Sequence, residues 1–167
     1  MKDSGDDFEF PEIGRKKPAR QPLFSYGNRS EIVYVTVSTK DRKRILGHDD
    51  IHALLLEKWE EADQWAVGRY VIMPDHVHLF CAPAAPEPVN VKNWVAFWKS
   101  RSATRWPRPE ESPVWLPDCW DRQLRNGESY SAKWEYVREN PVRHGFVKKA
   151  GDWPYQGEAN VLLWKDS

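Results

Sequence analysis

The residues with the clearest capacity for chemistry are two histidines separated by one residue, His76 and His78, in the stretch 70–80. They alternate with apolar residues, which indicates a β-strand. Successive side chains of a strand point to opposite faces, so we expect Val77 and Leu79 to face the core while both imidazoles face outward together. Two convergent imidazoles form half of a divalent-metal site.

The residues around the pair exclude several known ways of completing such a site. A histidine-triad hydrolase needs a further histidine where this chain has Phe80, and residues 79–82 lack the acid and histidine of the His-x-His-x-Asp-His hydrolases. Cys81 is expected on the opposite face. The pair therefore also fits a simple polar strand face. The remaining histidines stand at no motif spacing from the pair: His48, His52 and His144.

A second group of polar residues lies in the segment 134–145. Tyr136 and Asn140 are four residues apart, a spacing that places both on one face of a helix, while Trp134 would pack on another. A tyrosine hydroxyl can attack phosphorus, and an asparagine oxygen can join two imidazoles on Mg²⁺ or Mn²⁺. Taken alone, Tyr136 also fits a half-buried packing tyrosine.

These residues need a scaffold, and the periodicity of the chain predicts an α+β fold. The predicted strands are 31–39, 65–73, 76–82 and 119–125. The predicted helices are 49–63, 91–106 and 128–139. This order is the ferredoxin-like split βαβ arrangement, an antiparallel sheet with helices on one face. A C-terminal tyrosine-bearing helix, ended by Pro141, and an irregular tail follow it.

Charge and composition set the domain organisation. Lys+Arg and Asp+Glu are equal at 25 each, so no net field attracts or repels DNA. We expect a flexible charged arm over residues 1–29, one folded domain over 30–156 and a tail over 157–167. Basic residues near 99–108 alternate with tryptophans, which suits phosphate contacts and base stacking but also a solvated surface.

Cysteine content and hydropathy indicate the cellular compartment. The two cysteines, Cys81 and Cys119, lie far apart, and no Cys-x-x-Cys pattern occurs. The N-terminal residues lack the apolar stretch of a secretory signal, and no run approaches the length of a membrane span. We therefore expect a cytoplasmic protein. The sequence alone does not show which of its ten tryptophans pack in the core and which are placed to stack on a ligand.

Together the two polar groups resemble a known family. The stretch 73–78, Met-Pro-Asp-His-Val-His, resembles the metal motif of the HUH (His-hydrophobe-His) endonucleases and more closely that of the IS200-like single-tyrosine transposases. The segment 136–147 resembles the branch of REP-associated tyrosine transposases. The segments 119–125 and 152–155 also fit that branch. The resemblance covers roughly residues 30–156.

The resemblance implies a role for individual residues. His76 and His78 match the metal-binding pair, Tyr136 matches the nucleophile, and Asn140 stands where related transposases place a polar third ligand. The implied cofactor is a divalent metal, Mg²⁺ or Mn²⁺. Basic residues near these motifs are the candidate DNA contacts: Lys99, Arg101, Arg105, Arg138 and Arg143.

The implied activity is metal-dependent cutting and rejoining of single-stranded DNA near hairpins, through a 5′-phosphotyrosine intermediate. One alternative is a catalytically silent hairpin-DNA-binding protein derived from a transposase. Another is an unrelated metal-binding or scaffolding protein. The partner in the first two cases is single-stranded or hairpin DNA, without a membrane. The long tail favours a monomer over a dimer.

Overall fold

A computed structural model describes residues 31–125 and 128–163 of the chain. The arm predicted over residues 1–29 lies outside the described residues. The strands are β1 (Val33–Ser38), β2 (Trp65–Met73), β3 (His76–Pro83), β4 (Trp120–Gln123) and β5 (Gln156–Glu158). The helices are α1 (Asp49–Glu61), α2 (Val91–Thr104), α3 (Tyr130–Val137) and α4 (Asn140–Arg143). Short 3₁₀ segments occur at Lys40–Arg42, Pro109–Glu111 and Ala150–Asp152.

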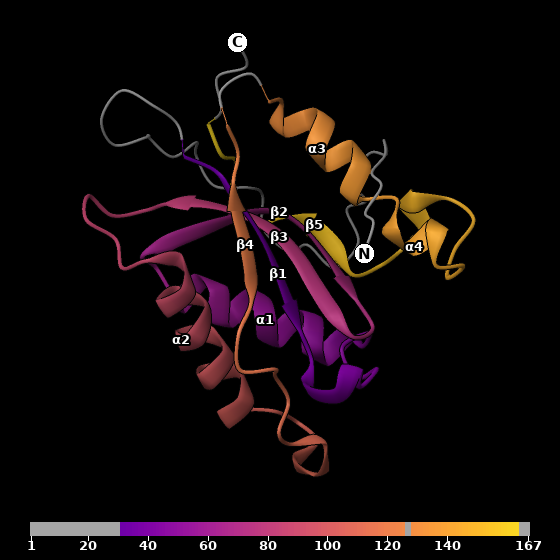
Figure 1. The fold of residues 1–167 in the computed structure, drawn as a ribbon. Helices are drawn as coiled ribbons and strands as arrows, with labels where there is room; N and C mark the ends of the chain where they lie inside the picture. The colour runs from indigo at the N-terminus through magenta and orange to yellow at the C-terminus, as the bar shows by residue number, and fades with distance from the viewer. Residues whose placement is uncertain (1–30, 126–127, 164–167) are drawn as a thin grey trace.

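The five strands form one sheet in the order β4-β1-β3-β2-β5, and every pairing is antiparallel (Figure 1). A hairpin joins β2 to β3 through Pro74 and Asp75. The predicted first strand lies centrally, as β1 between β3 and β4. The first four strands have the ferredoxin-like order, so the predicted α+β fold is confirmed.

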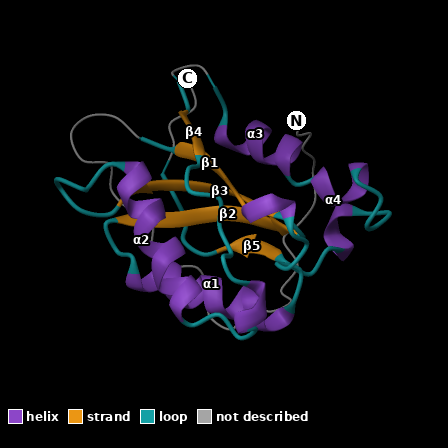
Figure 2. Ribbon diagram, turned by 60° about the horizontal axis from the view of Figure 1, so that its bottom comes forward, coloured by secondary structure: helices purple, strands orange, loops and turns teal. Residues whose placement is uncertain are grey.

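Helices α1 and α2 pack against one face of the sheet (Figure 2). On β1 and β3 the odd-numbered residues point to this face, and Val35, Val37, Val77 and Leu79 are completely buried. The face is rich in indole rings. Its tryptophans are Trp59, Trp65, Trp94, Trp98, Trp106 and Trp115. A fully buried apolar side chain contributes about 1.5–3 kcal/mol, so this layer is the main hydrophobic core.

The second face is covered by α3 and the segments that follow it (Figure 2). Phe80 on β3 contacts Tyr130 and Trp134 of α3 edge to face, and Trp153 belongs to the same cluster. The expectation that the histidines of β3 face outward is wrong for this reason. They lie on the predicted face, but the second layer covers them.

The C-terminal segment is more ordered than predicted. We expected an irregular tail, but β5 pairs with β2 at the sheet edge. The boundary drawn after residue 156 therefore falls inside a strand. Beyond it Leu162 is buried against the second face. Gly68 allows this approach, since a Cβ there would lie 2.6 Å from both Leu162 Cδ1 and Tyr130 Oη.

Within residues 31–125 and 128–163, no helix has the length and apolar character that crossing a membrane requires.

Candidate active site

The histidine pair lies on β3, in the centre of the sheet. Strand β1 flanks it on one side, where Thr36 pairs with His78, and β2 flanks it on the other. His76 is 2% exposed and His78 is 1% exposed. Both imidazoles are therefore fixed on a rigid strand and shielded from bulk water.

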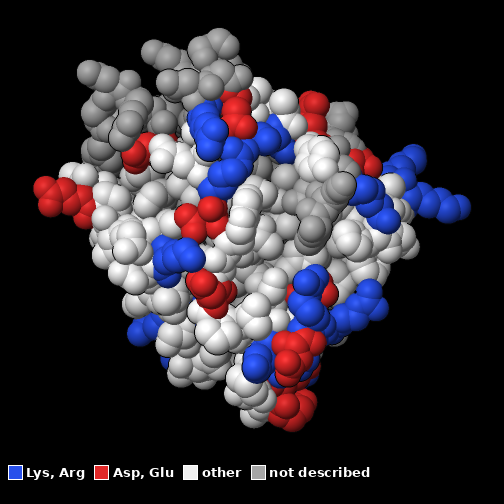
Figure 3. All heavy atoms as spheres, viewed as in Figure 1, with Lys and Arg blue, Asp and Glu red and all other residues white. Residues whose placement is uncertain are grey.

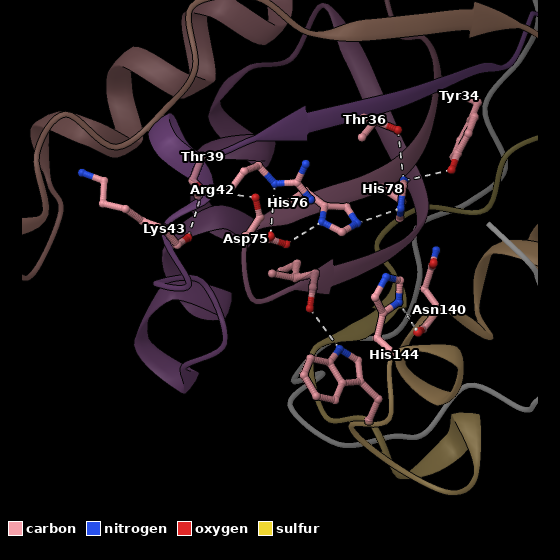
Figure 4. Close-up of polar contacts among 12 residues, drawn as sticks. Tyr34, Thr36, Thr39, Arg42, Lys43, Asp75, His76, His78, Asn140 and His144 are labelled. Carbon is pink, nitrogen blue, oxygen red and sulfur yellow. Dashed lines mark hydrogen bonds and ion pairs between the residues drawn. The ribbon is translucent and has the colours of Figure 1, made fainter. Parts of the chain in front are cut away.

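Asp75, in the turn that precedes β3, orients His76 (Figure 4). Nδ1 of His76 lies 2.7 Å from Asp75 Oδ1, and Arg42 Nε donates to Asp75 Oδ2 at 3.1 Å. Partial burial raises the pKa of Asp75, but the hydrogen bonds and positive charge of His76 and Arg42 outweigh it and lower the pKa to about 2. An ionised carboxylate only accepts, so Nδ1 of His76 carries a proton, and in the neutral form of the ring the lone pair is on Nε2.

Hydroxyl groups of β1 hold His78 in the same manner. Nδ1 of His78 lies 2.9 Å from Tyr34 Oη and 3.0 Å from Thr36 Oγ1. The Tyr34 ring also stacks beside the imidazole, with centroids 5.7 Å apart. The side chain of His78 is therefore anchored at Nδ1, and its Nε2 points toward His76.

The two Nε2 atoms lie 3.1 Å apart, with the ring planes at 81°. Two nitrogens that each lie about 2.1 Å from one ion, at a right angle, are about 3 Å apart. When one ring nitrogen of a histidine binds a metal, the N–H of the other commonly donates a hydrogen bond to a carboxylate or a similar group. The pair thus fits adjacent ligand positions on a divalent cation.

No cluster of three or more His, Cys, Asp and Glu side chains able to hold a metal occurs among the residues that the structure describes. A third ligand drawn from these described residues would be of another type. Asn140 and His144 extend from α4 in the direction of the histidine pair (Figure 4). Asn140 is completely buried; its Nδ2 donates to Val137 O at 3.1 Å, and its Oδ1 accepts from Arg143 Nη2 at 3.2 Å.

Tyr136 and Asn140 do not share one helix face, contrary to the prediction. Helix α3 ends at Val137, and α4 begins at Asn140 with Pro141 in its first turn. Pro141 has no N–H to donate to Val137 O, the carbonyl four residues earlier, so α3 cannot continue through it. As a result Tyr136 is 45% exposed whereas Asn140 is buried.

Arg143 connects the two separated residues. Its guanidinium carbon lies 5.3 Å from the centroid of the Tyr136 ring, within range of a cation–π interaction. The same guanidinium donates to Asn140 Oδ1. The structure therefore brings the predicted nucleophile, the predicted third ligand and one predicted DNA contact into one connected group.

The other predicted DNA contacts lie elsewhere. Lys99, Arg101 and Arg105 belong to α2 or its end, across the sheet from the histidines. Lys99 is 7% exposed and donates to the carbonyl oxygens of residues 116, 117 and 118, so its ammonium serves the fold. Arg101 is exposed near Glu61. Arg138, at the end of α3, is only 3% exposed, a position that does not favour DNA contact.

The site includes three residues that the sequence analysis did not select: Asp75, Tyr34 and Thr36. Asp75 directly precedes the first histidine. Tyr34 and Thr36 alternate with valines on β1, and this alternation was a usable signal for a polar strand face. Only the register between β1 and β3 shows that the two hydroxyls meet His78.

The fold and the site define an α+β protein with a His-hydrophobe-His pair on a central strand and a tyrosine on a helix over the same face. No protein-family model matches the chain. A REP-associated tyrosine transposase of Escherichia coli K12 is 27% identical, and the match covers 62% of this chain and 59% of that protein. A putative REP-associated tyrosine transposase of Haemophilus influenzae is 29% identical, with 50% and 53% covered.

The chain thus matches little more than half the length of these curated relatives. A solved structure of a REP-associated tyrosine transposase bound to a REP hairpin has the same fold, with a TM-score of 0.63 and 20% identity over 84% of this chain and 82% of that one. The resemblance predicted from the motifs is confirmed: the chain is similar in sequence to curated REP-associated tyrosine transposases.

Proposed function

We propose that this chain is a metal-dependent endonuclease and strand transferase that cuts single-stranded DNA near hairpins. The observation that carries the proposal is the convergence of two Nε2 atoms, 3.1 Å apart, from imidazoles whose Nδ1 atoms are both held by neighbours. Relatives named as transposases support DNA as the substrate. The hairpin bound to the protein of similar fold supports hairpin recognition.

His76, His78 and Asn140 are the residues that would hold the cation, Mg²⁺ or Mn²⁺. When bound, such an ion polarises a phosphate and orients it. The amide oxygen of Asn140 has two lone pairs, so it can accept from Arg143 and still face an ion. Asp75 and the hydroxyls of Tyr34 and Thr36 would keep both imidazoles in the ligating orientation.

Tyr136 would supply the nucleophile. Its Oη attacks the scissile phosphorus, the bond from phosphorus to the 3′ oxygen breaks, and the strand is left with a 5′-phosphotyrosine and a free 3′-hydroxyl. The proton lost by the phenol ends on that hydroxyl. Arg143 above the ring offsets the negative charge that develops on Oη. The covalent step keeps the phosphodiester energy, so rejoining needs no ATP.

The test is a denaturing gel of the protein incubated with labelled hairpin DNA that carries single-stranded flanks, in Mn²⁺. We expect label to migrate with the wild-type protein and not with Tyr136→Phe. The matched control is Tyr130→Phe on the same helix. Tyr130 is buried and its hydroxyl accepts from the Arg69 amide at 3.0 Å, so the folded fraction of this variant should retain the adduct.

Each contrary result has a specific meaning. An adduct on Tyr136→Phe would reject Tyr136 as the nucleophile. An adduct that forms equally well in EDTA would reject the metal. Binding of the hairpin in a native gel without any adduct would contradict the proposed endonuclease activity and favour a catalytically silent hairpin-binding protein.

A further inference from the structure

One large aromatic side chain on the active-site face is exposed without an assigned role. Trp120, the first residue of β4, is 51% exposed. The other tryptophans among the described residues are largely buried in the two layers. Exposing the apolar surface of an indole to water is unfavourable, so the position of Trp120 at the sheet edge calls for an explanation.

The strand register places Trp120 in one row with the histidine pair. Thr36 on β1 is directly opposite His78 on one side and directly opposite Trp120 on the other. Residues directly opposite on neighbouring strands project from the same face. Two strand spacings separate Trp120 from His78, which amounts to about 10 Å between their backbones. A nucleotide reaches that far from its phosphate to the base of its neighbour.

Tyr34 fills the space between the two residues. Its ring stacks on His78 and meets the Trp120 indole edge to face, with centroids 5.6 Å apart and planes at 79°. Tyr34 thus supports one side of the indole, while the exposed part remains available to a flat ligand.

Two basic side chains lie further along the same edge of the sheet. Arg122 follows on the same face of β4, and Lys133 of α3 lies close by. Both contact the single carboxylate of Glu128, at 3.0 and 3.4 Å. Figure 3 shows Lys and Arg side chains gathered at the end of β4 that leads toward α3, with fewer carboxylates among them. Two cations around one acid suit the phosphates of a nucleic-acid strand.

We infer that Trp120 is a stacking platform for an unpaired nucleobase of the strand whose phosphate lies at His76 and His78. This inference rests on the proposed function and deepens it, because it assigns the single-stranded part of the substrate to the β4 edge. Aromatic side chains accept any base, so Trp120 provides affinity for unpaired DNA without reading its sequence.

The test measures binding, in a Tyr136→Phe background so that the strand stays intact. The probe is a fluorescein-labelled DNA hairpin with an unpaired oligothymidine flank, followed by anisotropy. Trp120→Ala should weaken binding about 5- to 150-fold, and Trp120→Phe should retain most of the affinity. Trp120→Leu still covers the Tyr34 ring but lacks a π face, so it should behave like the alanine variant. Phe97→Ala, an equally exposed aromatic on α2, should change nothing.

A second measurement locates the base. Abasic nucleotides are placed one at a time along the flank. One position should weaken binding of the protein with Trp120 intact and should have no further effect on Trp120→Ala, as a double-mutant cycle requires for a direct contact. The same loss at every position in both proteins would overturn the inference, and so would Trp120→Leu binding as tightly as the parent.

These outcomes are separate from those of the proposed function. If the wild-type protein forms the tyrosine adduct while Trp120→Ala binds DNA as tightly as its parent, only the stacking inference fails. If neither adduct nor binding occurs, both fail. If Trp120→Ala converts a dimer to a monomer in sedimentation with unchanged DNA affinity, Trp120 serves self-association and the inference is rejected.

Discussion

The two faces of the sheet differ although they share every strand. On β3, Val77 and Leu79 point into an apolar layer formed with α1 and α2. The intervening His76 and His78 point to the opposite face, where they are equally buried but are held by a carboxylate and hydroxyl groups. Burial alone therefore does not separate a stabilising residue from a candidate functional one.

What separates the two faces is the use of hydrogen-bonding capacity. The apolar face buries aliphatic side chains and indoles, and the N–H groups of Trp94 and Trp115 donate to partners within the same layer. The other face buries two imidazoles whose Nδ1 atoms have partners and whose Nε2 atoms face one another. Two imidazole nitrogens held this close to one another form an arrangement that a cation would stabilise.

The largest difference in stability and activity should appear between the variants Leu79→Ala and His78→Ala. These two residues are neighbours on β3 but lie on opposite faces of the sheet. Leu79→Ala should lower the free energy of unfolding by about 2–5 kcal/mol through a core cavity. His78→Ala should be less destabilising but should abolish adduct formation. Chemical denaturation and the denaturing gel check the two expectations.

Metal binding provides an independent readout for the same pair of variants. A cation that binds only the folded protein raises its stability. Mn²⁺ should therefore raise the melting temperature of wild type and Leu79→Ala but not that of His78→Ala. A full Mn²⁺ response in His78→Ala would contradict the division of the sheet into a stabilising and a metal-binding face.

A third buried histidine, His52, lies on the side of the sheet covered by α1 and α2, where we expect a role in stability and none in metal binding. His52 on α1 places Nε2 2.6 Å from Tyr70 Oη. Burial lowers the pKa of His52 to about 4, and the Asp49 carboxylate only partly opposes this. The unfolded chain, with an ordinary pKa near 6.5, binds the proton more readily. The contribution of His52 is therefore complete above about pH 6.5 and is lost as the pH falls toward 4.

The expected loss over this window is about 3 kcal/mol, measured as the free energy of unfolding by urea at stepped pH. The control is His52→Gln, which cannot titrate and should show a flatter profile between about pH 4 and 6.5. Identical profiles for the two proteins would show that His52 does not titrate as its burial implies.

The sequence predicted most of the scaffold because its signals are local. Two predicted strands, 65–73 and 76–82, are separated only by Pro74 and Asp75, and the structure joins them as a hairpin. The tail was mispredicted because β5 is only three residues long, too short for a periodic pattern. Its strand character arises from pairing with β2, which is a non-local contact.

The candidate site was predictable only in part, for the same reason. The histidine pair is a local pattern, but its supporting hydroxyls come from β1, more than forty residues earlier. The four-residue spacing places Tyr136 and Asn140 on one face of a single helix, but α3 ends at Val137 and Asn140 begins α4. Their actual connection runs through Arg143, which helical spacing alone does not reveal.

The smallest expected effect compares one helix cap from each layer. Ser129 Oγ accepts from the Ala132 amide at the start of α3, and Asn90 Oδ1 accepts from the Asn93 amide at the start of α2. Replacing either by alanine should cost about 1 kcal/mol. The two variants should therefore be similar in urea denaturation.

Their effects on DNA processing should nevertheless differ. Helix α3 is only eight residues long and carries Tyr136, so fraying at Ser129 loosens the residue that must meet a phosphate at the histidines. We expect slower adduct formation by Ser129→Ala, measured on the folded fraction, and no change for Asn90→Ala. Equal rates at equal stability would mean that Tyr136 is positioned by α4 and Arg143 rather than by its own helix.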